Sequence, residues 1–87
     1  MKCTEYDLKH CQQGQTVEVT LSGNAANVLL LDSVNRQKYK NGQKYQYLGG
    51  NMTSSISQIQ IPRTGHWYVV IDLGGYAGNV TSKVRVI

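Results

Sequence analysis

The sequence predicts an all-β fold: a single small antiparallel β-sandwich, jelly-roll-like or a flattened barrel, with at most one short helical turn. Three observations predict it. Apolar residues recur with a period of two, Gly-rich turn signals separate short segments, and no segment carries a sustained helical stripe. With 87 residues and 40% hydrophobic content, the chain has room for one core, so residues 1–87 are expected to form one domain.

The first predicted strands lie in the run VEVTLSGNAANVLLLD. In it, Val17, Val19 and Leu21 alternate with polar residues, which is typical of a strand with one buried face. The tripeptide SGN, residues 22–24, signals a turn, and ANVLLLD then supplies a fuller apolar run of strand length. We therefore expect this run to form a hairpin.

The segment DSVNRQKYKNGQKYQYLGG is compatible with two structures. Asn41 and Gly42 could close a two-residue hairpin between RQKYK and QKYQY. Alternatively, a helical turn begins after an N-cap at Asp32 or Ser33 and ends at Gly42 in the left-handed conformation. Because both flanks are polar, we favour the helical turn, followed by a strand near Lys44–Leu48.

Residues 47–55, YLGGNMTSS, are predicted to be a loop, because they are small, hydroxylated and contain a Gly-Gly pair. After them, Ile59 and Ile61 alternate in a strand that ends at Pro62, whose ring cannot donate a ladder hydrogen bond. The last predicted strand is NVTSKVRVI. The residues that share one of its faces are Val80, Ser82, Val84 and Val86.

The stretch TGHWYVVIDLGG is predicted to be a core strand between Gly65 and the pair Gly74 and Gly75. One face is continuous and apolar, so it belongs to the core; it carries Trp67, Val69, Ile71 and Leu73. The other face is mixed, which suits an outer sheet face or the rim of a pocket; it carries His66, Tyr68, Val70 and Asp72.

Cys3 and Cys11 are expected to be free thiols buried as small hydrophobes in a cytoplasmic protein. The N-terminal MKCTEYDLKH carries Glu5 and Asp7 where a signal peptide is apolar, and no apolar run is long enough to span a bilayer. A metal site of both cysteines with His10 matches no common zinc spacing, and neighbouring residues of a strand project to opposite faces. We expect no metal, no cofactor and no membrane partner.

Catalytic residues are not predicted either. A cysteine nucleophile needs a histidine within hydrogen-bond reach and an orienting carboxylate, and nothing in the sequence places them together. The five acidic residues are scattered, without a spacing that pairs two of them. We therefore expect a protein that is not an enzyme.

The charge distribution gives the sharper indication of function. The net charge is +4, and no acidic residue occurs from Ser33 to Ile71, where basic residues alternate with aromatic ones. Cations neutralise phosphate and flat rings stack on bases, so the pattern fits an anionic small molecule or a nucleic acid. It equally fits a solvated face with tyrosines packed on a sheet. The candidate ligand-binding residues are Arg36, Lys38, Tyr39, Lys40, Lys44, Tyr45, Tyr47, His66 and Tyr68.

The alternative function is a protein-interaction or homo-oligomerisation domain without a small-molecule ligand. An exposed strand edge or the tyrosine-rich face would then join copies of the chain or another protein. The C-terminal VRVI is an apolar strand end without a charged tail, so its edge is one that a partner could cover.

Three stretches together resemble a known family: VEVTLSGNAANVLLLD, YKNGQKYQYLGG and IPRTGHWYVVIDLGGYAGNVTSKVRV. They look like a small bacterial β-sandwich domain family of unknown function, which occurs alone or fused to a TIR domain. The resemblance implies a compact β-sandwich without an established activity and, in the fused relatives, an accessory or sensing role. The stretches LSGNAANVLLLD and IPRTGHWYVVID are more loosely similar to jelly-roll modules of secreted peptidases or carbohydrate-binding proteins.

Overall fold

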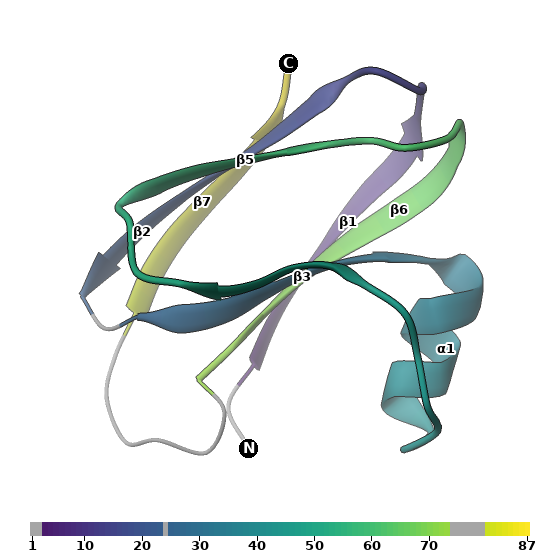
Figure 1. The fold of residues 1–87 in the computed structure, drawn as a ribbon, viewed down its shortest axis with the longest axis horizontal. Helices are drawn as coiled ribbons and strands as arrows, with labels where there is room; N and C mark the ends of the chain where they lie inside the picture. Colours follow the sequence, from purple (N-terminus) through teal and green to yellow (C-terminus); the bar gives the residue numbers. More distant parts are fainter. Residues whose placement is uncertain (1–2, 24, 74–79) are drawn as a thin grey trace.

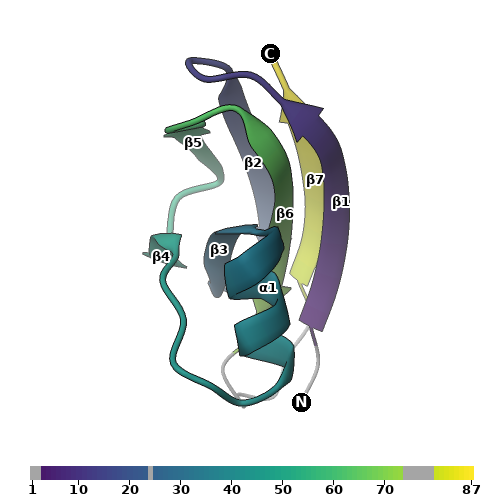
Figure 2. The same ribbon diagram turned by 90° about the vertical axis from the view of Figure 1, so that its right-hand side faces the viewer.

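The structure is a computed structural model that describes residues 3–23, 25–73 and 80–87. Within these ranges the chain forms seven strands and one helix; Figure 1 labels all of them except β4, which is labelled in Figure 2. The elements are β1 (Cys3–Cys11), β2 (Thr16–Gly23), β3 (Ala26–Asp32), α1 (Ser33–Lys40), β4 (Leu48–Met52), β5 (Ile56–Gln60), β6 (Gly65–Asp72) and β7 (Val80–Val86). Some predictions lie outside the described residues: those on Asn24, Gly74 and Gly75, and the burial of the Cys3 side chain.

The strands form two antiparallel sheets that pack face to face. One sheet has four strands in the order β1-β6-β3-β4, and the other has three in the order β5-β2-β7. Figure 2 looks onto the four-stranded sheet, with the three-stranded sheet behind it and β1 beside β7. The Tyr6 hydroxyl of β1 joins these two edges, because it donates to the Ser82 carbonyl oxygen of β7 at 3.1 Å. The predicted all-β sandwich is confirmed; in the described ranges the sheets do not close into a barrel.

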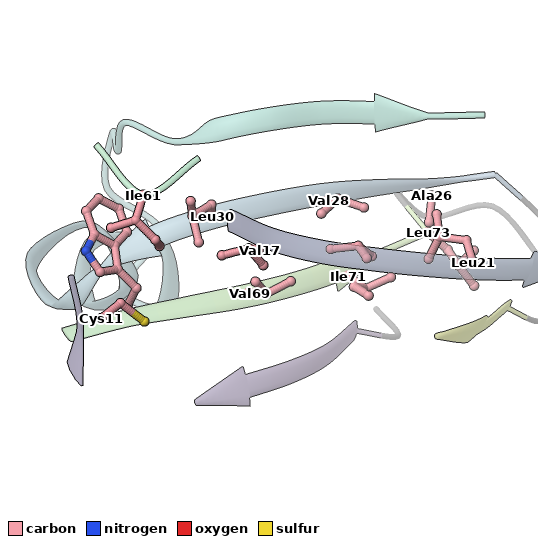
Figure 3. Close-up of a cluster of buried hydrophobic side chains, with 12 residues drawn as sticks. Cys11, Val17, Leu21, Ala26, Val28, Leu30, Ile61, Val69, Ile71 and Leu73 are labelled. Atoms are coloured by element: carbon pink, nitrogen blue, oxygen red, sulfur yellow. The ribbon is translucent and has the colours of Figure 1, made fainter. Parts of the chain in front are cut away.

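The hydrophobic core lies between the sheets and is drawn in Figure 3. Val17 and Val19 of β2 and Val69 of β6 have 0% exposed surface, as the period-two pattern predicts. Burying one such side chain contributes about 1.5–3 kcal/mol, so the alternation is a main source of stability. The other buried members of this cluster are Cys11, Leu21, Ala26, Val28, Leu30, Ile61, Trp67, Ile71 and Leu73.

The predicted hairpin between β2 and β3 is wrong, although both strands exist. β2 pairs with β5 and β7, whereas β3 pairs with β4 and β6, so the chain crosses from one sheet to the other between them. Both strands are central in their sheets. β3 buries Leu29 and Leu31 on one face and Val28 and Leu30 on the other, which requires covered positions on both sides. A turn signal does not distinguish a hairpin from such a crossing.

The helical alternative for the segment after Asp32 is confirmed, and the hairpin closed by Asn41 and Gly42 is wrong. The Asp32 carboxylate caps α1, because its Oδ1 accepts a hydrogen bond from the Asn35 amide at 2.8 Å. The helix ends at Lys40 with Asn41 as its C-cap, and Gly42 follows with φ of 72°, as predicted. At eight residues α1 is longer than a single turn, and the described residues contain no helix that could cross a bilayer, which takes about 20 apolar residues.

The predicted strand at Lys44–Leu48 is wrong, because residues 43–47 pair with no strand. The backbone amide of Gln46 donates instead to the Asn35 side chain at 2.8 Å, which fastens this segment to α1. Figures 1 and 2 show it turning at the C-terminal end of the helix and running back alongside the helix before it enters β4.

The predicted loop at residues 47–55 is also partly wrong, because β4 occupies its centre. β4 pairs with β3, and its Gly49 lies opposite Leu29 with φ of 105°. A Cβ atom at this position would collide with the carbonyl oxygen of Val28. Of the two glycines that suggested a loop, Gly49 therefore permits a close approach of the edge strand to β3.

The predicted faces of the later strands are confirmed. β5 ends just before Ile61 and Pro62, and β6 turns its Trp67 face into the core. The β7 residues predicted to share a face, Val80, Ser82, Val84 and Val86, are less exposed than those between them. The opposite face of β6 differs along its length, because His66 is exposed while Val70 is buried. The difference arises because α1 and residues 43–47 cover only part of this face.

Candidate functional site

The predicted site residues gather on one outer face of the sandwich, that of the four-stranded sheet. Figure 2 shows α1 lying across this face. Most of the predicted site residues fall into three groups: residues that pair with carboxylates, tyrosines that pack on the sheet, and lysines without a carboxylate partner in the described residues. α1 supplies Arg36, Lys38, Tyr39 and Lys40, the segment after it supplies Lys44, Tyr45 and Tyr47, and β6 supplies His66 and Tyr68.

Arg36 and Lys40 are paired with Glu5 of β1. The Arg36 guanidinium donates to Glu5 Oε1 at 2.7 Å through Nη2, and its Nε lies 3.2 Å from both carboxylate oxygens. Lys40 Nζ lies 3.6 Å from Glu5 Oε2. The hydrogen bond from Arg36 is the main reason that the pKa of Glu5 is lowered. An internal anion thus already neutralises two of the predicted cations.

His66 and Tyr68 lie beside this ion pair. The His66 and Tyr68 rings are stacked with centroids 4.6 Å apart, and the Arg36 guanidinium carbon lies 4.6 Å from the Tyr68 centroid. His66 Nε2 lies 2.6 Å from Asp7 Oδ1, and the pKa of Asp7 is lowered, first by the backbone amide of Lys9 and then by His66. We call this group the paired cluster: Glu5, Asp7, Arg36, Lys40, His66 and Tyr68.

Tyr39 and Tyr45 pack as part of a second hydrophobic cluster. Their rings meet edge to face with centroids 5.1 Å apart, and the Tyr39 hydroxyl donates to Asp72 Oδ2 at 3.1 Å. Burial raises the pKa of Tyr45. The two rings therefore hold α1 and residues 43–47 onto the sheet. The buried residues beneath them are Leu29, Leu31 and Val70.

Lys38 and Lys44 lie together at an open depression, which we call the lysine depression. Its volume is about 590 Å³, and its lining contains no carboxylate. Five of the other cations in the described residues pair with Asp or Glu, and Lys83 on the opposite sheet is the third without such a pair. The lysine depression is lined by Asn35, Lys38, Lys44, Tyr45 and Gln46.

A second hollow, which we call the tryptophan cleft, has a volume of about 230 Å³. In it, Arg63 pairs with Asp32, and its guanidinium carbon lies 5.0 Å from the centre of the Trp67 ring. The indole Nε1 of Trp67 donates to the Arg63 carbonyl oxygen at 2.9 Å. Hydrogen bonds from Asn35 and the charge of Arg63 outweigh burial, so the pKa of Asp32 is lowered. The remaining lining residues are Leu30, Asn35, Gln46, Tyr47, Leu48 and Pro62.

The tryptophan cleft is a site that the sequence prediction missed. Arg63 and Trp67 stand out in the basic and aromatic interval, but Asp32 precedes that interval and 31 residues separate it from Arg63. Two weak signals point to it: the N-cap position of Asp32 and the aromatic residue at position 67. Neither indicates that the end of β3 lies beside the start of β6.

The thiol and metal chemistry considered from the sequence has little support in the described residues. Cys11 is buried, and burial raises the pKa of its thiol, which keeps it protonated. His10, its neighbour, is exposed on the other face of β1. Among the side chains that the structure describes, no three histidine, cysteine or acidic residues are grouped closely enough to hold a metal ion.

A comparison with protein-family models matches residues 1–87 to a family described as Domain of unknown function (DUF1883). No match is found among curated proteins or among solved structures. The family's description assigns no activity, so the functional argument depends on the geometry above.

Proposed function

The chain belongs to the family described as Domain of unknown function (DUF1883), and we propose that it is a non-enzymatic ligand-binding or sensing module for an anionic small molecule or nucleic acid. The proposed binding site is the lysine depression. Lys38 and Lys44 supply the positive charge, and Asn35, Tyr45 and Gln46 complete the surface.

The observation that supports this proposal is the pairing pattern of the cations. Arg36, Lys40 and Arg63 each have a carboxylate partner, so a ligand anion competes with an internal one for them. Lys38 and Lys44 have no such competitor in the described residues, and they line the same depression. An anion placed between two unpaired ammonium groups gains Coulomb energy from both.

The paired cluster and the tyrosine pair have a supporting role in this proposal. Arg36 and His66 connect α1 and β6 to carboxylates of β1. Tyr39 and Tyr45 pack α1 and residues 43–47, which we call the cover, onto the sheet. These contacts position the backbone that carries Lys38 and Lys44. Their substitution is therefore expected to change stability before it changes ligand contacts.

The test is a binding titration at low ionic strength with tripolyphosphate and with a short single-stranded oligonucleotide. The double variant Lys38→Gln/Lys44→Gln is expected to bind both probes more weakly. Its plot of log affinity against log salt should become shallower by about 2, since each phosphate-contacting lysine contributes about 1. Lys83→Gln, which removes the same charge from the other sheet, is the matched control and should bind like the wild type.

Two outcomes would overturn the proposal. In the first, neither probe binds at low salt. In the second, Lys83→Gln weakens binding as much as Lys38→Gln alone or Lys44→Gln alone does, which would mean that only the net charge matters.

A homo-oligomer remains the second candidate, because two isoleucines are exposed on the outer face of the three-stranded sheet. Ile56 and Ile87 are 57% and 55% exposed, and both pair with outward-facing threonines of β2. Light scattering of the wild type and of Ile56→Lys tests it. A dimer that this substitution dissociates would support oligomerisation, and a monomer at all concentrations would count against it.

The setting of the module is also part of the proposal. The sequence resemblance suggests a bacterial protein and a relation to domains that are fused to TIR domains in other chains. A cytoplasmic location agrees with Cys11, which is a free thiol. The absence of catalytic function rests on the sequence argument and on the buried, protonated state of that thiol.

A further inference from the structure

We propose that the site binds a nucleotide unit, with its phosphate on the lysine depression and its planar base in the tryptophan cleft. This inference rests on the proposed function and deepens it, because it names the chemistry that accompanies the anion. A free nucleotide and one unit of a single strand share this chemistry.

The two hollows adjoin each other. Asn35 and Gln46 line both of them, and the Gln46 backbone amide donates to Asn35 Oδ1 at 2.8 Å, which forms a bridge between the two. A ligand can therefore occupy both hollows by crossing this bridge. One hollow offers unpaired cations and the other offers rings, which is the combination that nucleotide-binding surfaces use.

The walls of the tryptophan cleft suit a flat, partly apolar group. Tyr47 is 49% exposed, so its ring can accept a base without a change in the core. The Arg63 guanidinium is held in place by Asp32 and lies over Trp67, so it presents a second flat surface that is also positively charged. Stacking on such surfaces tolerates every base, because each base has a π face.

The size of the cleft favours a base over a larger ligand. Its volume of about 230 Å³ is below the roughly 300–1,000 Å³ of sites that enclose a drug-sized molecule. A ligand centred here must therefore place only a small planar part inside. The remainder then lies outside, where the lysine depression provides charge.

Gln46 is the residue that can read the edge of the base. The side chain of Asn35 is already engaged, since Nδ2 donates to Asp32 at 2.9 Å and Oδ1 accepts from Gln46. The side-chain amide of Gln46 makes no hydrogen bond to another described residue, so both its donor and its acceptor are free. A carboxamide can form two hydrogen bonds with a base edge.

The experiment compares base-bearing with base-free anions and follows the fluorescence of Trp67, the single tryptophan of the chain. Tripolyphosphate, a nucleoside triphosphate and a short oligothymidylate are titrated into the full chain. A change in Trp67 emission is expected with the two base-bearing probes and not with tripolyphosphate. Equal affinity for the two base-bearing probes would identify a free nucleotide as the ligand, and tighter binding of the oligonucleotide would identify a single strand.

Variants of Tyr47 separate stacking from charge. Tyr47→Ala should weaken binding of the base-bearing probes by about 5- to 150-fold and leave tripolyphosphate binding unchanged. Tyr47→Phe keeps the ring and should bind like the wild type. Val34→Ala, at an exposed apolar residue that lines neither hollow, controls for a general loss of surface, and thermal unfolding confirms that each variant folds.

The result that would overturn this inference differs from the one that would overturn the proposed function. If base-bearing and base-free probes bind with the same affinity and Tyr47→Ala has no effect, the base does not enter the cleft, although the anion site stands. If no anion binds at all, both proposals fail. A loss of tripolyphosphate binding in Tyr47→Ala would also contradict the separation of the two hollows.

Discussion

The two outer faces of the sandwich differ in what covers them. On the three-stranded sheet, Glu18 of β2 accepts hydrogen bonds from Arg85 at 2.7 Å and from Gln58 at 3.1 Å, and the side chains of β5 and β7 on this face are exposed. On the four-stranded sheet, α1 and residues 43–47 cover Leu29 and Leu31, which are 5% and 0% exposed. The sandwich therefore has a bare half and a covered half, and the candidate site is built on the cover.

The largest expected difference between the halves is in the free energy of unfolding that is lost when one side chain is truncated. Leu31→Ala removes a fully buried side chain from beneath the cover and should lower the free energy of unfolding by about 2–5 kcal/mol. Thr20→Ala, on the outer face of β2, should change it by less than about 0.5 kcal/mol. Urea denaturation of both variants measures the contrast. If the free energy of unfolding falls by a similar amount in the two variants, the covered face does not act as a second core.

The sequence predicts this difference between the halves only in part. The alternation in QTVEVTLS is typical of one buried face, and β2 indeed has one. The unbroken run in ANVLLLD indicates burial on both faces, and β3 has it. What the sequence does not reveal is the identity of the cover, because α1 is a polar helix without a fully buried residue. It packs mainly through the half-buried Tyr39, and a single ring leaves no periodic signal.

The candidate site is predicted less well for a related reason. The interval from Ser33 to Ile71 contains no acidic residue, so all of its cations look unpaired in the sequence. The partners come from outside the interval, since Glu5 of β1 pairs with Arg36 and Lys40, and Asp32 pairs with Arg63. Pairing between strands distant in sequence depends on sheet order, which local patterns do not specify. The charged surface could be predicted from the sequence. Which two of its lysines lack a carboxylate partner in the described residues could not.

A smaller effect should follow from loss of the helix cap, which only the covered half possesses. Asp32→Ala removes the acceptor of the Asn35 amide and the partner of Arg63 and should lower the free energy of unfolding by about 0.5–2 kcal/mol. Asp32→Asn is the matched control, because asparagine keeps the capping oxygen and loses the charge. We expect the free energy of unfolding to fall less in Asp32→Asn than in Asp32→Ala in the same denaturation experiment. Equal losses would mean that the ion pair, rather than the cap, holds the cover.

The smallest expected effect concerns the contact between the cover and β1. Glu5→Gln should lower the free energy of unfolding by about 0.2–1 kcal/mol at pH 7, the usual range for a partly exposed ion pair. The pKa of Glu5 is lowered in the folded protein from its usual 4.5, so its stabilising contribution is fully present above about that pH. It is lost as the pH falls through the lowered folded value. The difference between wild type and variant should therefore shrink below about pH 4.5.

A glutamate-to-glutamine substitution on the bare half serves as a control for the contact between Glu5 and α1. Glu18→Gln breaks the pair with Arg85 but touches no part of the cover, whereas Glu5→Gln releases Arg36 and Lys40 of α1. Hydrogen exchange of the α1 amides should accelerate in Glu5→Gln and stay at the wild-type rate in Glu18→Gln. Unchanged exchange in Glu5→Gln would show that the other contacts of α1, such as the Asp32 cap and the tyrosine packing, keep the helix in place without Glu5. The ion pairs of Glu5 would then contribute nothing to positioning Lys38.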